Sequence, residues 1–165
     1  EFERRQSLRI EHGDPTDQLA FHNLYQLRIP LEIEAAGLAA IHRTSADLAR
    51  LDETLEQMTG AEKWTEQGIV ADLAFHRALA TATQNEYFPL FTSFIAERIS
   101  LAIQAARAKA VLEEIVEVTI AEHVAIRDAV AIGDPVKARQ AMRHHLIQAA
   151  ARLDLALETL QGEIS

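Results

Sequence analysis

The sequence predicts an all-α antiparallel bundle of six to seven helices around a central ligand or metal cavity. Apolar residues recur with the 3.6-residue period of a helix in every segment after residue 14, and no alternating run suggests a strand. Residues with high helix propensity dominate the composition, and the chain has only six glycines and four prolines. A chain of 165 residues is long enough to form one domain with a sizeable core.

The chain is expected to begin with a linker, residues 1–13, because these residues show no clear period. Residues 14–165 are expected to form the helical domain. Its first helix is predicted over 15–41, with Asp14 as the N-cap. The residues that keep the helical period predict the apolar face of this helix: Leu24, Leu27, Leu31, Ala35 and Leu38.

Capping and turn residues divide the rest of the chain into five more helices. A capping box that starts at Thr44 predicts a helix reaching residue 58, and Gly60 is placed to end it. The following helices are predicted over 62–83, 86–109, 113–132 and 135–161. Neither Gly nor Pro marks the boundary near residue 110, so that boundary rests on the apolar period alone.

The last two helices are predicted to form an antiparallel pair, because only a three-residue turn, Gly133-Asp134-Pro135, separates them. His123 then lies about 15 Å of helix before the turn and His145 about 15 Å after it, at a rise of ~1.5 Å per residue. The two imidazoles are therefore expected at the same height on facing helices.

A carboxylate and three imidazoles on otherwise apolar helix faces predict one divalent-metal site, formed by Asp72, His76, His123 and His145. Asp72 and His76 are four residues apart, so they share one face of their helix. Zn is the expected ion, with Ni, Fe or Mn as alternatives. Any single histidine of the set could instead be a core residue satisfied by a hydrogen bond, but the matched spacing of all four favours a metal site.

Other titratable residues near these positions are not expected to be ligands. His144 shares its face with Gln140 and Gln148 and is expected to point to solvent or to the rim of a cavity. Glu122 is also expected to face solvent, because adjacent residues of a helix diverge by about 100° and His123 takes the inward direction. The remaining histidines are expected at the surface: His12, His22 and His42.

Composition excludes several classes of function. The chain has no cysteine, which excludes a disulfide framework, a thiolate zinc site and thiol redox chemistry, and which fits a cytoplasmic protein. Its net charge of −9 argues against DNA binding by this chain, because a DNA-binding surface needs basic side chains to neutralise phosphates. No run of roughly 20 apolar residues predicts a membrane span.

Four segments of the chain resemble, in order and spacing, the C-terminal effector-binding (FCD) domain of FadR-type regulators in the GntR superfamily of bacterial transcription factors: LYQLRIPLEIEAAGLAA, DLAFHRALATATQN, EHVAIRDAVAIGD and ARQAMRHHL. The resemblance implies a helical bundle that binds a small effector, preceded in full-length proteins by a winged helix-turn-helix domain. No winged-helix pattern precedes the first helix here. Residues 1–13 are therefore expected to be the remnant of a linker to a missing DNA-binding domain.

The resemblance further implies the metal-binding branch of that family. Its members have an Asp and a His four residues apart, a His in an EH-x-x-I pattern and a His just before a Leu near the end, which match Asp72, His76, His123 and His145. Effectors of this branch are small carboxylates or sugar acids. The implied protein is thus a sensor domain and not an enzyme, expected to be a homodimer that contacts DNA only through the missing domain.

Arg28 is the first expected effector contact, because the family often has Arg at this place and a guanidinium can bind a carboxylate with two hydrogen bonds. Asn85 and Arg98 are further candidates. Arg28 could equally form an ion pair with Glu32, four residues on, and the two roles are compatible.

Two other functions stay open at this point. One is a helical-bundle metal hydrolase, although the sequence shows no second acid on the metal-bearing faces to act as general base. The other is a metal sensor or a structural metal site without an organic effector.

Overall fold

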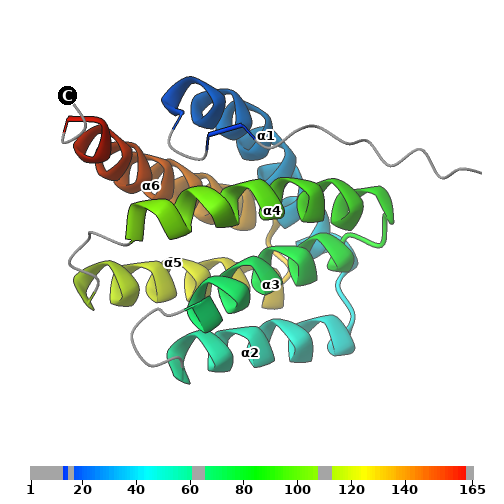
Figure 1. Cartoon of the computed structure of the whole chain (residues 1–165). Coiled ribbons are helices and arrows are strands. Elements are labelled where there is room, and N and C mark those ends of the chain that lie inside the picture. Colours follow the sequence, from blue (N-terminus) through cyan, green and yellow to red (C-terminus); the bar gives the residue numbers. More distant parts are fainter. Residues whose placement is uncertain (1–12, 15–16, 61–65, 108–112, 163–165) are drawn as a thin grey trace, which may run out of the picture.

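The computed structural model describes residues 13–14, 17–60, 66–107 and 113–162, and all secondary structure in these residues is helical (Figure 1). The helices are α1 (Gln18–His42), α2 (Ser45–Gly60), α3 (Glu66–Ala82), α4 (Tyr87–Arg107), α5 (Glu113–Ala131) and α6 (Pro135–Gly162). The prediction of a helical bundle without a sheet is confirmed for these residues. The predicted linker lies almost wholly outside them.

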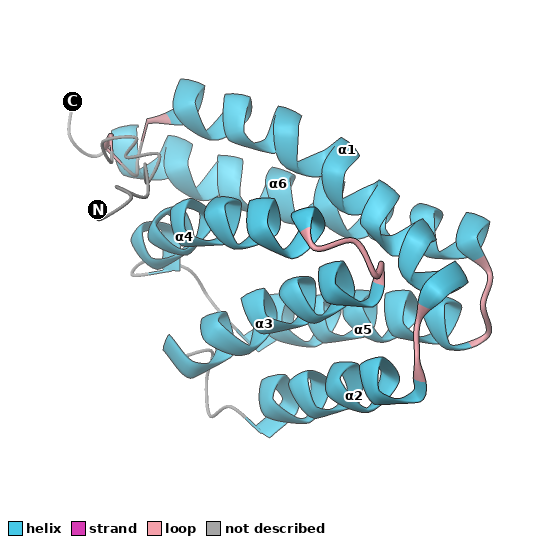
Figure 2. Ribbon diagram, turned by 90° about the vertical axis from the view of Figure 1, so that its right-hand side faces the viewer, coloured by secondary structure: helices cyan, strands magenta, loops and turns pink. Residues whose placement is uncertain are grey.

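The two longest helices, α1 and α6, make the most extensive helix–helix contact of the bundle. α3 lies between α2 and α4, and α5 packs against α6 as the predicted hairpin (Figure 1). Figure 2 shows α1 and α6 together along one side of the molecule, with α4, α3 and α2 following below. This arrangement brings faces of α1, α3, α5 and α6 toward one interior. Among the described residues, no helix is long and apolar enough to cross a membrane.

The turn between α5 and α6 has the predicted construction. Gly133 adopts a φ of 73°, in the left-handed region that glycine enters without steric cost. Its N–H donates to the carbonyl of Val130, and the N–H of Asp134 donates to that of Ala129, so orphan carbonyls of α5 are satisfied. The Asp134 side chain in turn accepts from the N–H of Lys137 at 3.0 Å and caps α6.

The predicted N-cap is correct for α2 and wrong for α1. The capping box at Thr44 is confirmed: Thr44 Oγ1 accepts from the N–H of Asp47, and Asp47 Oδ2 accepts from that of Thr44. The assignment of Asp14 as the cap of α1 is wrong. Asp17, directly before the first helical residue, accepts from the second and third N–H groups that follow it.

The predicted apolar face of α1 is confirmed at Ala35, which is buried, and at Leu24 and Leu31, which pack against the core, but it is wrong at Leu27, which is 55% exposed. The interior side of the helix also presents Tyr25, Arg28 and Glu32, which are at most 4% exposed. Burying an unpaired charge is costly. Here Arg28 and Glu32 pair with each other, and this pairing offsets part of the cost of burial.

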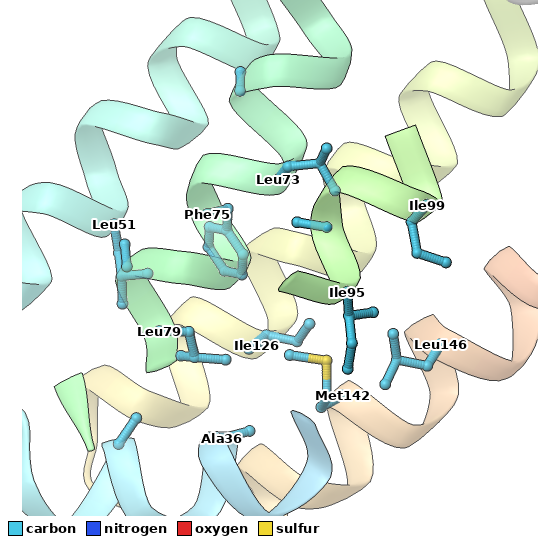
Figure 3. Packing of buried hydrophobic residues seen from close by; sticks show 14 of the residues in the cluster. Ala36, Leu51, Leu73, Phe75, Leu79, Ile95, Ile99, Ile126, Met142 and Leu146 are labelled. Carbon is cyan, nitrogen blue, oxygen red and sulfur yellow. The ribbon is translucent and has the colours of Figure 1, made fainter. Parts of the chain in front are cut away.

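The apolar core fills the space between α1, α2, α3, α4, α5 and α6. It is rich in alanine, which lets the helices approach closely, and its largest members interdigitate in Figure 3. The large side chains that Figure 3 labels and that are almost fully buried are Leu51, Phe75, Leu79, Ile99, Ile126, Met142 and Leu146. This core positions the inner faces of α3, α5 and α6, on which the candidate site lies.

Candidate metal centre

The structure brings together the four side chains predicted as ligands. Asp72 and His76 lie on the inner face of α3, His123 on α5 and His145 on α6. All four are at most 6% exposed, and one potential ligand atom from each lies within 4.8 Å of the other three. The predicted equal height of His123 and His145 is confirmed, since their ring centroids are 4.3 Å apart.

The hydrogen bonds on the outer side of two rings fix which ring nitrogen faces inward with a lone pair. His123 Nδ1 lies 2.7 Å from the carbonyl oxygen of Thr119, which can only accept, so Nδ1 carries the proton. His145 Nδ1 lies 2.8 Å from the carboxylate of Glu122 and donates to it. The Nε2 atoms of both rings therefore point into the cluster, where each is an acceptor in the neutral form of its ring.

His76 has the same arrangement with a carboxylate from α1. Its Nδ1 lies 3.1 Å from Glu32 Oε1, although off the direction of a well-aligned hydrogen bond. Its Nε2 lies 3.3 Å from His145 Nε2. Glu32 is held from its other side by Arg28, whose Nε donates to Glu32 Oε2 at 2.6 Å and whose Nη1 donates to the hydroxyl of Tyr25. Glu32 thus links α1 to the cluster.

Glu122 is not the solvent-facing acid that the sequence predicted. It is 8% exposed, and Arg152 grips it from α6 through two hydrogen bonds of 3.0 and 2.8 Å. The 100° divergence from its neighbour His123 is real, but it aims Glu122 at the outer edge of the His145 ring instead of at water. In the sequence, Arg152 could have predicted this position of Glu122. It lies two helical turns after His145 on the same face, where an arginine requires an acidic partner.

The inner atoms of the cluster fit a metal ion better than they fit one another. His123 Nε2 is buried without a directed hydrogen bond, 2.9 Å from the oxygen Asp72 Oδ1, and in the neutral ring with its proton on Nδ1 both atoms are acceptors. Acceptors in contact repel unless a proton or a cation lies between them. A divalent ion with bonds of about 2.0–2.2 Å draws its ligands to within about 3–4 Å of one another. Small movements of these side chains would satisfy that requirement.

The electrostatics of the cluster keep it in the form that a cation binds. Burial, and then repulsion from His123, lower the pKa of His145 to about 3, so its imidazole is neutral near pH 7. Burial alone would raise the pKa of Glu32, but Arg28 and His76 outweigh it and lower that pKa to about 2. Burial would likewise raise the pKa of Glu122, but His145 and Arg152 lower it to about 2. Both carboxylates are therefore ionised acceptors for imidazole N–H groups.

The other residues singled out in the sequence lie outside the cluster. His144, His22 and His42 are exposed, as predicted, and His12 lies outside the described residues. Asn85 is exposed in the turn before α4, where its side chain accepts from the N–H of Tyr87. The guanidinium of Arg98 lies 3.8 Å from the centroid of the Phe94 ring. The expected ion pair of Arg28 with Glu32 is present.

A helical bundle with a buried Asp and three His on its inner faces defines the class of this protein: the chain belongs to the FCD domain family, whose model matches residues 23–148. The resemblance to the FCD domain of GntR-family regulators is thereby confirmed. The chain is 37% identical over 129 residues to the HTH-type transcriptional regulator LutR of Bacillus subtilis, covering 74% of this chain and 57% of that protein. It is 29% identical over 150 residues to the Uxu operon regulator of Haemophilus influenzae, covering 90% and 56%. The chain thus spans little more than half the length of these relatives.

Solved structures of bacterial proteins share the fold. The Escherichia coli protein McbR/YncC matches with a TM-score of 0.73 and 23% identity, over 87% of this chain and 70% of that one. A Streptococcus agalactiae GntR structure matches with a TM-score of 0.68 and 23% identity, over 82% and 60%. At this level of identity the matches establish the helical architecture. The curated relatives, in contrast, are both named as regulators.

Proposed function

We propose that this domain is the sensor of a transcription regulator and binds a small carboxylate or sugar acid beside a divalent metal ion. The observation that carries the proposal is the convergence of three imidazole Nε2 atoms and a carboxylate oxygen, each imidazole having an acceptor at its Nδ1. Carboxylates or carbonyls that orient metal-bound imidazoles in this way are a recurrent feature of protein metal sites. Asp72, His76, His123 and His145 would hold the ion, with Zn expected first and Ni, Fe or Mn as alternatives.

The bound ion would supply positive charge and coordination positions for an effector oxygen in a site with few competing waters. Arg28 is the residue best placed to bind a second effector oxygen. Two of its five N–H donors are engaged by Glu32 and Tyr25, so donors remain for an anion. Asn85 and Arg98 stay as weaker candidates. Since the four ligand residues are at most 6% exposed, the effector must displace side chains that cover them.

In the whole protein, effector binding would change DNA binding by an N-terminal domain outside this sequence. The Bacillus subtilis relative is named an HTH-type transcriptional regulator, which supports a DNA-binding part of this kind. The net charge of −9 favours a division of labour in which this domain does not contact DNA. We further propose that the domain is a cytoplasmic homodimer, so that a shift in helix packing can alter the spacing of two DNA-binding domains.

The geometry disfavours the alternative function of a helical-bundle metal hydrolase. The two acids nearest the cluster, Glu32 and Glu122, are each bound by an arginine, and both have a pKa of about 2. A carboxylate with so low a pKa is a weak general base near pH 7. The remaining alternative is a metal site without an organic effector, and the following binding experiment distinguishes it from the proposed function.

Calorimetry against a panel of small carboxylates and sugar acids tests the proposal, with the purified chain loaded with Zn and again after chelation. We expect at least one acid to bind the loaded form and to bind at least about tenfold more weakly after chelation. An Arg28→Lys variant, which keeps the charge but loses the planar fork, should also bind the acid more weakly. Binding that is unchanged by chelation, or no binding across the panel, would contradict the role of the metal in effector recognition.

A further inference from the structure

The solvent side of α4 carries large apolar side chains along much of its length. Tyr87 and Leu90 are each 61% exposed, Phe91 is 53% exposed and Leu101 is 38% exposed. The buried side of the same helix, which includes Ile95, already packs against the bundle. α4 is therefore apolar on two sides, and its outer side meets the core only through the half-buried Phe94. Contiguous exposed apolar surface of this kind marks interaction sites on soluble proteins.

The spacing on this side is that of a helix built to pack against another helix. Positions 87, 91, 94, 98 and 101 follow one another at intervals of four, three, four and three residues. At about 100° per residue they fall within a stripe roughly 80° wide, and Leu90 extends one edge of it. A seven-residue repeat of this form is the pattern of coiled-coil seams. We call these six residues the α4 stripe: Tyr87, Leu90, Phe91, Phe94, Arg98 and Leu101.

The charges around the stripe favour contact with a second copy of the same acidic chain. No ionisable acid or base occurs from Phe88 to Ala96, although a quarter of all residues are charged and the net charge is −9. Within the stripe, Arg98 is the single charged side chain, and its guanidinium lies over the Phe94 ring. The exposed Glu97 borders the stripe, but along Phe88 to Ala96 two acidic copies can approach with less repulsion than they would meet across most other surfaces.

We infer that the α4 stripe is the surface through which two copies of this chain associate, with α4 of one copy packed along α4 of the other. The inference rests on the homodimer in the proposed function and assigns its surface. A closed dimer needs a self-complementary patch, and a helix with a seven-residue repeat matches a copy of itself. The stripe is about 20 Å long at ~1.5 Å per residue, which suits the apolar centre of an interface with a polar rim.

Sedimentation velocity on the whole chain tests the inference with two matched variants. Phe91→Glu places a carboxylate within the α4 stripe, and Val70→Glu does the same at a residue of α3 that is equally exposed, at 55%. We expect the wild type and Val70→Glu to sediment at twice the 18.3 kDa chain mass, and Phe91→Glu to dissociate at least about tenfold more readily. Thermal unfolding of each variant checks that the monomer stays folded.

Cross-linking gives an independent result, because the chain has no cysteine of its own. A Phe94→Cys variant has its thiol at the middle of the stripe and should form a disulfide-linked dimer under mild oxidation, whereas Val70→Cys should stay monomeric on a non-reducing gel. A dimer that persists in Phe91→Glu would overturn the assigned surface while leaving the proposed homodimer intact. A wild-type chain that stays monomeric at all concentrations would overturn both the surface and self-association.

Discussion

Two interior regions of this bundle are equally buried but are held together by different physics. The apolar core, represented by Leu51, Leu79 and Ile126, is formed by side chains that need only shape and volume from their neighbours. The proposed metal centre brings together potential ligand atoms of Asp72, His76, His123 and His145 within 4.8 Å of one another. The core is complete by itself, whereas we propose that a cation completes the centre. Stability of the first region should therefore be independent of metal, and stability of the second should depend on it.

Chelation should have the largest effect that separates the two regions. An ion present at about 1,000 times its Kd stabilises the folded state by about 4 kcal/mol, which is roughly 8–16 °C in the unfolding temperature of a chain this size. We expect a fall of that order when the Zn-loaded protein is treated with a chelator, measured by differential scanning calorimetry. The His123→Ala variant is the control and should show little change, since its centre lacks a ligand.

A cavity in the apolar core should be costly but indifferent to metal. Leu51 is fully buried, and Leu51→Ala should lower the free energy of unfolding by about 2–5 kcal/mol. Chemical denaturation with and without chelator checks this prediction. The loss caused by the substitution should be the same in both conditions. A loss that disappears after chelation would show that the core and the centre are coupled, contrary to the comparison.

Removing the charge of an outer carboxylate should weaken the centre without disturbing the core. Glu122→Gln keeps the size of the side chain but replaces the ionised acceptor that orients His145 and pairs with Arg152. We expect metal affinity to fall by about 10–100-fold, as for other groups that orient metal-bound imidazoles. Competition with a fluorescent zinc chelator measures the affinity. Glu34→Gln, which alters an exposed ion pair with Arg139, is the matched control and should change the affinity little.

Mild acid should have the smallest effect on the metal-free protein. The pKa of His145 is about 3 in the folded chain and about 6.5 when unfolded, so the unfolded state binds protons first as the pH falls. Stability is therefore lost as the pH falls below about 6.5, by under about 1 kcal/mol from this residue between pH 7 and 6. Glu32 and Glu122, with pKa values of about 2, contribute stability that is lost only between about pH 4.5 and 2. Urea denaturation at a series of pH values tests this order.

The sequence predicted the centre better than it predicted the surroundings of the centre. The four side chains were identified because helical spacing and a three-residue turn fix their faces and heights, and these are local properties. Glu122 was missed because its partners, His145 and Arg152, come from the next helix. The contact of Glu32 with His76 was missed for a related reason: the sequence predicted the pair of Arg28 with Glu32, but the partner on α3 comes from another helix. Residues defined by long-range polar contacts leave little trace in local patterns.

The exposed Leu27 in α1 shows what apolar periodicity can and cannot assign. Leu27 has the right spacing for a core residue but is 55% exposed, and Phe91 on α4 is exposed to a similar degree. Apolar spacing thus reports that a face can be buried, but it does not report which partner buries it. For α4 we assign that partner as a second copy of the chain.

Metal content is the most direct test of the account. Elemental analysis of the purified chain after loading with Zn and removal of excess ion should give one Zn per chain for the wild type. His145→Ala should lose most of this metal, because it removes one of four converging ligands, whereas His144→Ala should keep all of it, because that neighbour is exposed. Equal metal in the wild type and in both variants would contradict a metal centre at these residues.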